Sequence, residues 1–272
     1  MRFQVFVRVA IAAALFVSFA GWALAQEAVS AYSRTIRVEG IGDLPYYAQN
    51  DPQWADIPYE PRGSESRRSM EDGGCGPTAL AMAVARQLPE ERLPELLSHA
   101  ANPERGFPYC ACSVGAYRHR GDHEVAFPTE PADFAGALPV IFASYATGNN
   151  DHWAKMRRAG VSGTSLPLMD MICEAYGLRY EPYQDWEDAL GALEDGFSVI
   201  TTVTEGIFTE TSHYLCIAGV ADGFVYLLDP LMRSEYPRDR QGRLEVVEPG
   251  LVRTKLEEAE KLRLYGFYAI GK

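Results

Sequence analysis

The pattern of apolar positions along the chain is strongest just after residue 74, where it predicts a buried helix. The segment from Cys75 to residue 85 holds no charge and carries strong helix formers, with apolar residues on every side. This is typical of a helix enclosed by the core. Pro77 fits the first helical turn, because the N–H that proline lacks has no intrahelical partner there. The polar residues 60–74, which end in two glycines, indicate a loop before this helix.

Helices dominate the first part of the chain and strands the last. Amphipathic periodicity and closing glycines predict three more helices: residues 89–99, residues 166–176 before Gly177, and residues 186–194 before Gly196. Residues with high β-propensity predict strands over 35–38, 197–203, 213–220, 224–228 and 264–270. Helices followed by an antiparallel sheet place the chain in the α+β class.

The organisation of the chain indicates one domain. No Pro- or Ser-rich linker divides residues 45–272, so we predict a single domain there, preceded by a polar arm over 26–44. Residues 100–163 are rich in Pro, Gly and aromatic residues and predict an irregular insertion within the domain. A monomer is expected.

The N-terminus predicts export. Arg2 and Arg8 are followed by an apolar run over residues 9–19, and a small-x-small site ends at Ala25. Together these features are typical of a secretory signal peptide over residues 1–25, cleaved after Ala25. An uncleaved anchor is the alternative, but the apolar run is shorter than the roughly 20 residues that a membrane span needs. We therefore expect a secreted or periplasmic protein with no stable membrane insertion after cleavage.

Charge and cysteine content exclude several classes of protein. The formal net charge is -12, and such a surface repels nucleic acid and anionic membranes. Five cysteines are too few for a fold built on disulfides, and their odd number leaves at least one unpaired within the chain. They are Cys75, Cys110, Cys112, Cys173 and Cys216.

Cys75 is the first candidate for chemistry. A cysteine at the start of a buried helix lies at the positive end of the helix dipole, which lowers the thiol pKa and favours the thiolate. Gly73, Gly74 and Gly76 surround it and leave room for a substrate carbonyl. A buried structural cysteine is the alternative; the three glycines argue against it, because a core thiol needs no such neighbours.

A nucleophilic cysteine needs a base, and His213 is the candidate. It is the only one of the five histidines that opens a strand in the sheet-forming half. It follows Cys75 by about 140 residues, so the two would meet in space and not in sequence. A structural histidine at a strand start is the alternative reading.

Asp229 ends the next predicted strand and is the candidate to orient His213. We predict a three-residue hairpin loop over 221–223, with Gly223 left-handed. Leu215 then faces Asp229, and His213 is a diagonal neighbour of Asp229 on the same face. A two-residue turn would instead put His213 and Asp229 on opposite faces. The alternative for Asp229 is a turn residue that ends the strand.

Four short motifs together resemble the bacteriocin-processing-peptidase-like branch of the papain superfamily. They are Pro-Tyr-Tyr-Ala-Gln over residues 45–49, Gly-Cys-Gly-Pro-Thr over 74–78, Ser-His-Tyr over 212–214 and Asp-Pro over 229–230. The resemblance covers roughly 45–82 and 164–231 and leaves 100–163 unexplained. It implies a papain-like fold in which the helix carrying the cysteine packs on an antiparallel sheet. It also implies the role of each site residue: nucleophile Cys75, base His213, orienter Asp229 and oxyanion donor Gln49.

This resemblance predicts a cysteine peptidase that acts on a peptide or protein substrate, and the signal peptide predicts that it is exported. Two alternatives remain open. One keeps the triad but acts on another acyl substrate, as an amidase or transpeptidase on cell-wall peptides or as a γ-glutamyl transferase. The other is a binding module without activity.

No cofactor or metal is expected. The four side chains that could suggest a metal site, Cys110, Cys112, His119 and His123, lack standard zinc spacing. A disulfide or two half-buried thiols are the simpler readings of the cysteine pair. Cys173 on a helix and Cys216 on the face opposite His213 are expected in the core.

Overall fold

The computed structural model describes residues 32–52, 54–56, 59, 68–88, 138–139, 142–143, 164 and 166–272. The predicted signal peptide, the helix over 89–99 and nearly all of the insertion over 100–163 lie outside the described residues. No helix within the described ranges is long and apolar enough to cross a membrane.

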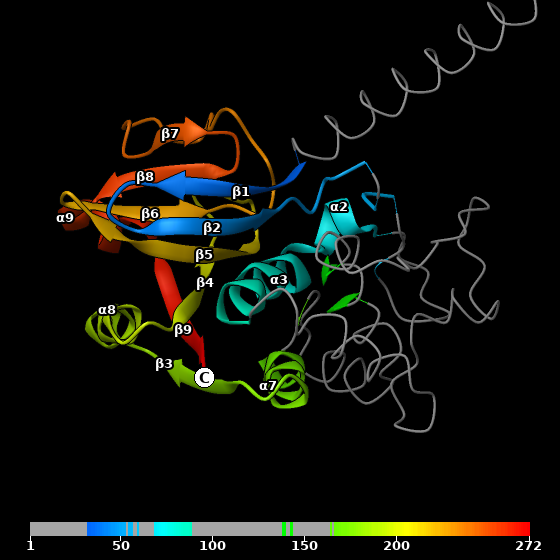
Figure 1. Cartoon of the computed structure of the whole chain (residues 1–272). Coiled ribbons are helices and arrows are strands. Elements are labelled where there is room, and N and C mark those ends of the chain that lie inside the picture. The colour runs from blue at the N-terminus through cyan, green and yellow to red at the C-terminus, as the bar shows by residue number, and fades with distance from the viewer. Residues whose placement is uncertain are drawn as a thin grey trace, which may run out of the picture.

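A seven-stranded antiparallel sheet forms the centre of the structure, in the order β3-β9-β4-β5-β6-β8-β7. Its strands are β3 (Arg179–Tyr183), β4 (Ser198–Thr204), β5 (Ser212–Ala221), β6 (Phe224–Leu228), β7 (Glu245–Glu248), β8 (Leu251–Lys255) and β9 (Leu264–Gly271). A separate antiparallel hairpin of β1 (Ser33–Val38) and β2 (Gly42–Tyr47) lies beside it (Figure 1).

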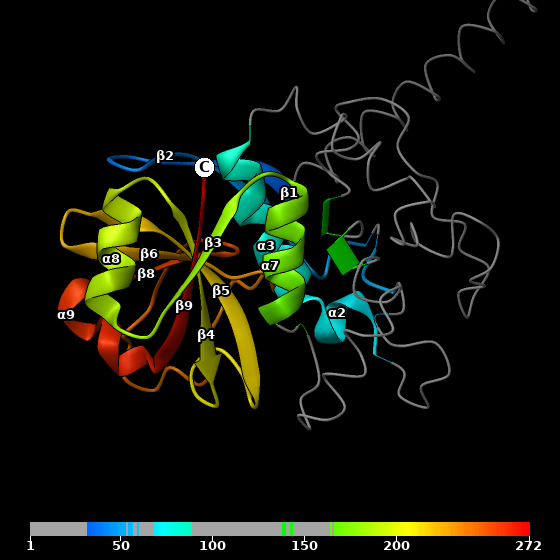
Figure 2. The same cartoon turned by 90° about the horizontal axis from the view of Figure 1, so that it is seen from below.

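Helices cover both faces of the sheet (Figures 1 and 2). The helical elements are α2 (Met70–Gly73), α3 (Cys75–Gln87), α7 (Leu166–Ala175), α8 (Trp186–Glu194), α9 (Leu256–Ala259) and the 3-10 turn η3 (Glu260–Leu262). Helix α3, the β1–β2 hairpin and α7 pack on one face, and α8 with α9 on the other. Alternation along the strands divides the core accordingly: Cys216 faces α3, whereas its neighbours Leu215 and Ile217 face the opposite core. The α+β, papain-like architecture predicted from the sequence is confirmed.

Most predicted elements are present. Helix α3 begins at Cys75, with Pro77 in its first turn and every residue from Gly76 to Val84 buried. Helix α7 is followed by Gly177 at φ 67°, the left-handed conformation that ends many helices. The prediction of a loop over residues 60–74 was wrong at its end, where α2 forms. Strands β2, β3, β7 and β8 were not predicted, because charged residues or a proline interrupt their apolar patterns.

The β5–β6 hairpin corrects one detailed prediction. Its loop has two residues, Asp222 and Gly223 at φ 50° and 79°, and Ala221 pairs directly with Phe224. The predicted three-residue loop was therefore wrong. Positive φ at both loop positions is typical of the tight turns whose twist suits a hairpin.

A bulge within β5 restores the register that the loop does not provide. Ile217 pairs with Leu227, but Gly219 pairs with Tyr226, so Ala218 is an extra residue in β5. Extending the register beyond Ile217 sets Leu215 opposite Asp229, as predicted. Gly219 takes φ 154° at the bulge, and a Cβ there would lie 3.0 Å from Ile41. The register that places His213 and Asp229 on one face of the sheet thus comes from the bulge in β5 and not from the turn.

Candidate active site

Cys75 is the first residue of α3 and lies at a sharp junction between two helices. Helix α2 starts with a capping box in which the Ser69 hydroxyl accepts from the Asp72 N–H and the Asp72 carboxylate accepts from the Ser69 N–H. Helix α2 ends at Gly73, and the N–H of its C-cap residue Gly74 donates to the Met70 carbonyl at 2.7 Å. Helix α3 then begins at once, so Cys75 lies at its positive end and remains partly exposed.

The glycines around Cys75 have packing roles that the sequence did not reveal. A Cβ on Gly74 would lie 2.5 Å from the Met70 carbonyl oxygen, and one on Gly76 would lie 2.0 Å from Thr164 Oγ1. The argument that a structural cysteine would need no such glycines was therefore wrong, because the close approach of Met70 and Thr164 requires them. Because Gly74 and Gly76 have no side chains, the backbone on either side of the Cys75 thiol is also free of side-chain bulk.

His213 lies at the start of β5, between Cys75 and Asp229. Its Nε2 is 2.6 Å from Asp229 Oδ1, and both side chains are buried, with 5% and 0% of their surfaces exposed. The imidazole is also near enough to the Cys75 thiol for the two groups to shift each other's pKa. Because Asp229 occupies Nε2, the nitrogen available to the thiol is Nδ1. The structure therefore brings together the three residues that the sequence put forward as a triad.

Asp229 is held by a dense set of hydrogen bonds. Its Oδ1 also accepts from the Leu231 N–H at 2.9 Å, and its Oδ2 accepts from the Tyr236 hydroxyl at 2.8 Å. Arg233 Nε lies 3.8 Å from Oδ2. The Tyr46 hydroxyl donates to the Asp229 backbone carbonyl at 2.9 Å. A buried carboxylate with this many donors is satisfied and keeps one orientation, so it can fix the ring of His213.

Cys75, His213 and Asp229 shift each other's pKa in the direction that favours the charged form of each group. Burial alone would lower the pKa of His213, but the charge and hydrogen bond of Asp229, together with Cys75, raise it to about 10. Burial alone would raise the pKa of Cys75, but His213 and the Tyr214 and Gly76 backbone amides lower it below its usual value. The pKa of Asp229 falls as well, because His213 outweighs burial. At neutral pH the arrangement favours a thiolate, an imidazolium and a carboxylate.

Gln49 lies at the junction between α2 and the Asp229 turn. Its backbone N–H donates to the Pro230 carbonyl at 2.7 Å, and its side-chain Nε2 donates to the Glu71 carbonyl at 2.5 Å. The side chain is 3% exposed, and its Oε1 has no hydrogen-bond partner in the described part of the chain. The amide is therefore rigidly placed between the helix that leads to Cys75 and the residue that follows Asp229. One hydrogen on Nε2 is left for a further acceptor.

The other cysteines differ from Cys75. Cys173 and Cys216 are buried, as expected from the sequence; both are free thiols, and burial raises the pKa of each to about 12. The Cys216 thiol donates to the Ala79 carbonyl at 3.1 Å. Cys110 and Cys112 lie outside the described residues, as do His119 and His123. The residues that the structure describes contain no group of three or more side chains suited to hold a metal ion.

Several residues around the site escaped the sequence analysis. Tyr236 and Arg233 contact Asp229, and Thr164 accepts from the Tyr214 hydroxyl through its carbonyl at 2.9 Å. None of them belongs to the four motifs. The Asp-Pro pair was the one available signal, because a turn at this pair would bring the residues that follow it back toward Asp229.

Two comparisons with known proteins bear on this chain. A search of curated proteins gives no match. A family model, described as the Peptidase_C39 like family, matches residues 41–246, a range that includes Gln49, Cys75, His213 and Asp229. The match covers well over half of the chain, which therefore belongs to this family of bacteriocin-processing-peptidase-like cysteine peptidase domains.

Proposed function

We propose that this protein is an exported cysteine peptidase that cleaves peptide bonds through Cys75, His213 and Asp229. The observation that carries the proposal is the position of His213 between the Cys75 thiol and the buried Asp229 carboxylate, to which its ring is hydrogen-bonded at 2.6 Å. A thiol at a helix start beside a charged imidazole is the arrangement that makes cysteine nucleophilic near neutral pH.

Acylation follows from the charges of the resting site. The Cys75 thiolate attacks the carbonyl carbon of the scissile peptide, and the carbonyl oxygen takes up the negative charge. The imidazolium of His213 donates its Nδ1 proton to the amine nitrogen as the C–N bond breaks. The amine leaves, the acyl group stays on Cys75 as a thioester, and Asp229 holds the now neutral ring in place through Nε2.

Deacylation reverses the proton transfer. Neutral His213 accepts a proton at Nδ1 from a water molecule, whose oxygen attacks the thioester carbonyl. The C–S bond breaks, Cys75 leaves as the thiolate, and the substrate acid departs. The site returns to its initial thiolate–imidazolium state, so the cycle consumes one water for each bond cleaved.

The oxyanion of both tetrahedral intermediates requires donors. The Cys75 backbone N–H is one of the first N–H groups of α3, which have no intrahelical acceptor. The second donor in this proposal is Nε2 of Gln49, which donates one hydrogen to Glu71 and keeps the other. Removing one such donor costs roughly 100- to 1,000-fold in kcat in enzymes with this chemistry.

The proposal extends to location and partners. The charged and apolar pattern of residues 1–25 supports export and cleavage after Ala25. The mature enzyme would act as a monomer on peptides or proteins. Its strong negative charge makes nucleic acid an unfavourable partner.

The test is a cleavage screen of the purified protein against a complex peptide library and, separately, against cell-wall peptide fragments. We expect new peptide termini from the library with the wild type and none with Cys75→Ala. Gln49→Ala should still be alkylated at Cys75 but should cleave far more slowly. Cleavage of cell-wall fragments alone would contradict the peptidase assignment and favour an amidase. Equal cleavage by wild type and Cys75→Ala would contradict the nucleophile.

A further inference from the structure

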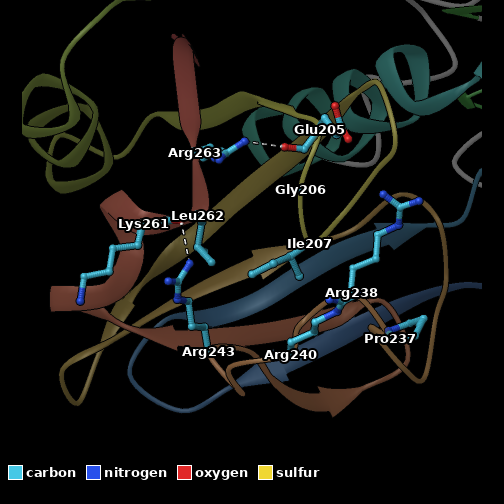
Figure 3. Close-up of a pocket in the computed structure, with 10 residues that line it drawn as sticks. All are labelled: Glu205, Gly206, Ile207, Pro237, Arg238, Arg240, Arg243, Lys261, Leu262 and Arg263. Carbon is cyan, nitrogen blue, oxygen red and sulfur yellow. Dashed lines mark hydrogen bonds between the residues drawn. The ribbon is translucent and has the colours of Figure 1, made fainter.

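A basic pocket lies apart from the triad in a chain that is acidic overall. Its volume is about 670 Å³, within the range of ligand sites. Ten residues line it (Figure 3): Glu205, Gly206, Ile207, Pro237, Arg238, Arg240, Arg243, Lys261, Leu262 and Arg263. Five of them are basic and one is acidic, although the whole chain carries 37 acidic and 25 basic residues. Such a local reversal of charge indicates a surface that attracts anions.

The basic side chains of this pocket are only partly neutralised by acids. Arg238 forms an ion pair with Glu210, and Lys261 pairs with Glu258 at 2.6 Å. Arg243 is also near Glu258, at 3.8 Å. Three cations thus share two carboxylates, both of them outside the pocket lining.

The other two cations, Arg263 and Arg240, are not paired with a carboxylate and so remain available to bind an anionic ligand. Arg263 donates to the Glu205 backbone carbonyl at 3.2 Å, a neutral acceptor, and the figure shows the two groups facing each other (Figure 3). Arg240 is exposed, and its guanidinium has no hydrogen-bond or ion-pair partner among the described residues; only its backbone N–H is bonded, to the Arg238 carbonyl at 2.9 Å. Guanidinium groups present donors in a planar fork that matches carboxylate oxygens. The pocket is therefore suited to bind carboxylates.

The sheet places this pocket close to the triad. In the row of paired residues across it, Val203 lies between His213 on β5 and Leu264 on β9. Arg263 directly precedes Leu264, so its backbone is about two strand spacings, or roughly 10 Å, from that of His213. An extended peptide spans this distance with about three residues.

The pocket also lies on the face of the sheet that holds Tyr236, the hydrogen-bond partner of Asp229. Leu262 and Leu215 belong to the same core, and Leu215 is two positions from His213 on β5. Glu205, Gly206 and Ile207 belong to the loop that joins β4 to β5 and so leads directly to the base. Only residues 208–212 separate this part of the pocket lining from His213 along the chain.

From this geometry we propose that the pocket is a subsite for acidic side chains of the peptide substrate, about three or more residues from the scissile bond. The proposal rests on the peptidase function put forward above. Aspartate and glutamate side chains supply the carboxylates that Arg240 and its neighbours can bind. The -12 charge of the chain disfavours long polyanions such as nucleic acid, whereas a short acidic segment reaches only the basic pocket.

The first test measures binding without catalysis. The probe is fluorescein-labelled tetraglutamate with an amidated C-terminus, titrated by anisotropy against the Cys75→Ala chain at low salt. Labelled tetraglutamine with a free C-terminal carboxylate is the comparison. We expect tetraglutamate to bind tighter, and Arg240→Gln to weaken its binding by roughly fivefold to tenfold, as for loss of one charge-assisted contact. Arg240→Glu should weaken it further.

Arg37→Gln is the matched control, because Arg37 is an exposed arginine on β1 that does not line the pocket and is paired with Asp43 at 3.7 Å. It should leave tetraglutamate binding unchanged. Equal binding of the two peptides, or equal effects of Arg240→Gln and Arg37→Gln, would overturn the subsite. Tighter binding of tetraglutamine would assign the pocket to a terminal carboxylate and would also overturn the side-chain proposal.

The second test is the cleavage profile of the active chain on the peptide library. Acidic residues should be enriched about three or more positions from the cleaved bond, and Arg240→Gln should remove that enrichment while neutral sites are still cut. Cleavage with no acidic preference would overturn the subsite and leave the peptidase function intact. Binding that depends on Arg240, with no cleavage at all, would overturn the peptidase function and with it the pocket's role in substrate binding.

Discussion

The guanidinium of Arg86 donates to the backbone carbonyl of Ala218 across 2.6 Å. Ala218 is the extra residue of the β5 bulge, and Arg86 lies in the last turn of α3, the helix that begins at Cys75. Because the bulge places His213 on the same face as Asp229, the helix that carries the nucleophile also fixes the register of the base and its orienter. The Arg86–Ala218 hydrogen bond thus connects the helix that begins at Cys75 to the strand that carries His213.

Replacing Arg86 should weaken both stability and activity. Arg86→Met keeps the length and apolar stem of the side chain but leaves the Ala218 carbonyl without its donor, at a cost of about 1–3 kcal/mol in the free energy of unfolding. Activity should fall as well, because the bulge is then free to shift. Urea unfolding and kcat/KM would be measured against Arg37→Met, whose parent side chain is exposed. Equal effects of the two substitutions would contradict the role of Arg86.

How far the sequence predicts this structure is clearest in the same hairpin. The pairing of Leu215 with Asp229 was predicted, because a face shared by His213 and Asp229 requires it. The loop that would produce it was not predicted correctly, because the Asp222–Gly223 pair favours a two-residue turn and the extra residue lies inside β5. A bulge at Ala218 has no local signal other than Gly219, since it depends on Arg86 and Ile41 from elsewhere in the chain.

Elements with continuous apolar or amphipathic patterns were predictable, and elements that depend on distant contacts were not. Helix α8 has the predicted bounds, because its periodicity and closing glycine are local. Helix α2 was missed, because it has only four residues and depends on the capping box of Ser69 and Asp72. The basic pocket was missed because its residues come from three separate segments of the sequence.

Tyr236 should support the base through Asp229. Tyr236→Phe removes the hydroxyl that donates to Asp229 Oδ2 at 2.8 Å, and loss of a hydrogen bond to a charged group should destabilise the fold by about 1.5–3 kcal/mol. Because Asp229 then holds His213 less firmly, kcat should fall more than KM changes. The matched control is Tyr183→Phe, which loses a hydroxyl bond to the more exposed Glu181. Steady-state kinetics in which Tyr236→Phe behaves like Tyr183→Phe would count against this role.

Gly76 should tolerate no side chain. A Cβ there would lie 2.0 Å from Thr164 Oγ1 and 2.2 Å from Thr164 Cβ, so Gly76→Ala forces Thr164 away or shifts α3. We expect a loss of about 1–3 kcal/mol, as for other overpacked core sites. Gly191→Ala is the control: it lies within α8 with nothing within 4 Å of its Cβ, and alanine there should stabilise by about 0.5–1 kcal/mol. Thermal unfolding that ranks the two variants in the opposite order would refute this packing.

The pH dependence of kcat/KM should be bell-shaped with a high alkaline limit. On the acid side activity should appear as the Cys75 thiol loses its proton, at a pH below the usual thiol pKa, because His213 lowers the pKa of Cys75. On the alkaline side it should fall as pH rises through about 10, because the imidazolium of His213 then loses the proton needed by the leaving amine. An alkaline limb near the ordinary histidine pKa of about 6.5 would show that Asp229 does not hold the proton on His213.

The most direct measurement of the Cys75–His213 pair is the rate of alkylation by iodoacetamide as a function of pH, with mass spectrometry to identify the modified cysteine. We expect fast modification of Cys75 with an apparent pKa well below the free-thiol value of about 8.5, and loss of that low pKa in His213→Ala. Cys173 and Cys216 serve as internal controls, because burial raises the pKa of each to about 12. Slow modification of Cys75, or the same pH profile in wild type and His213→Ala, would contradict the activated pair on which the proposed peptidase rests.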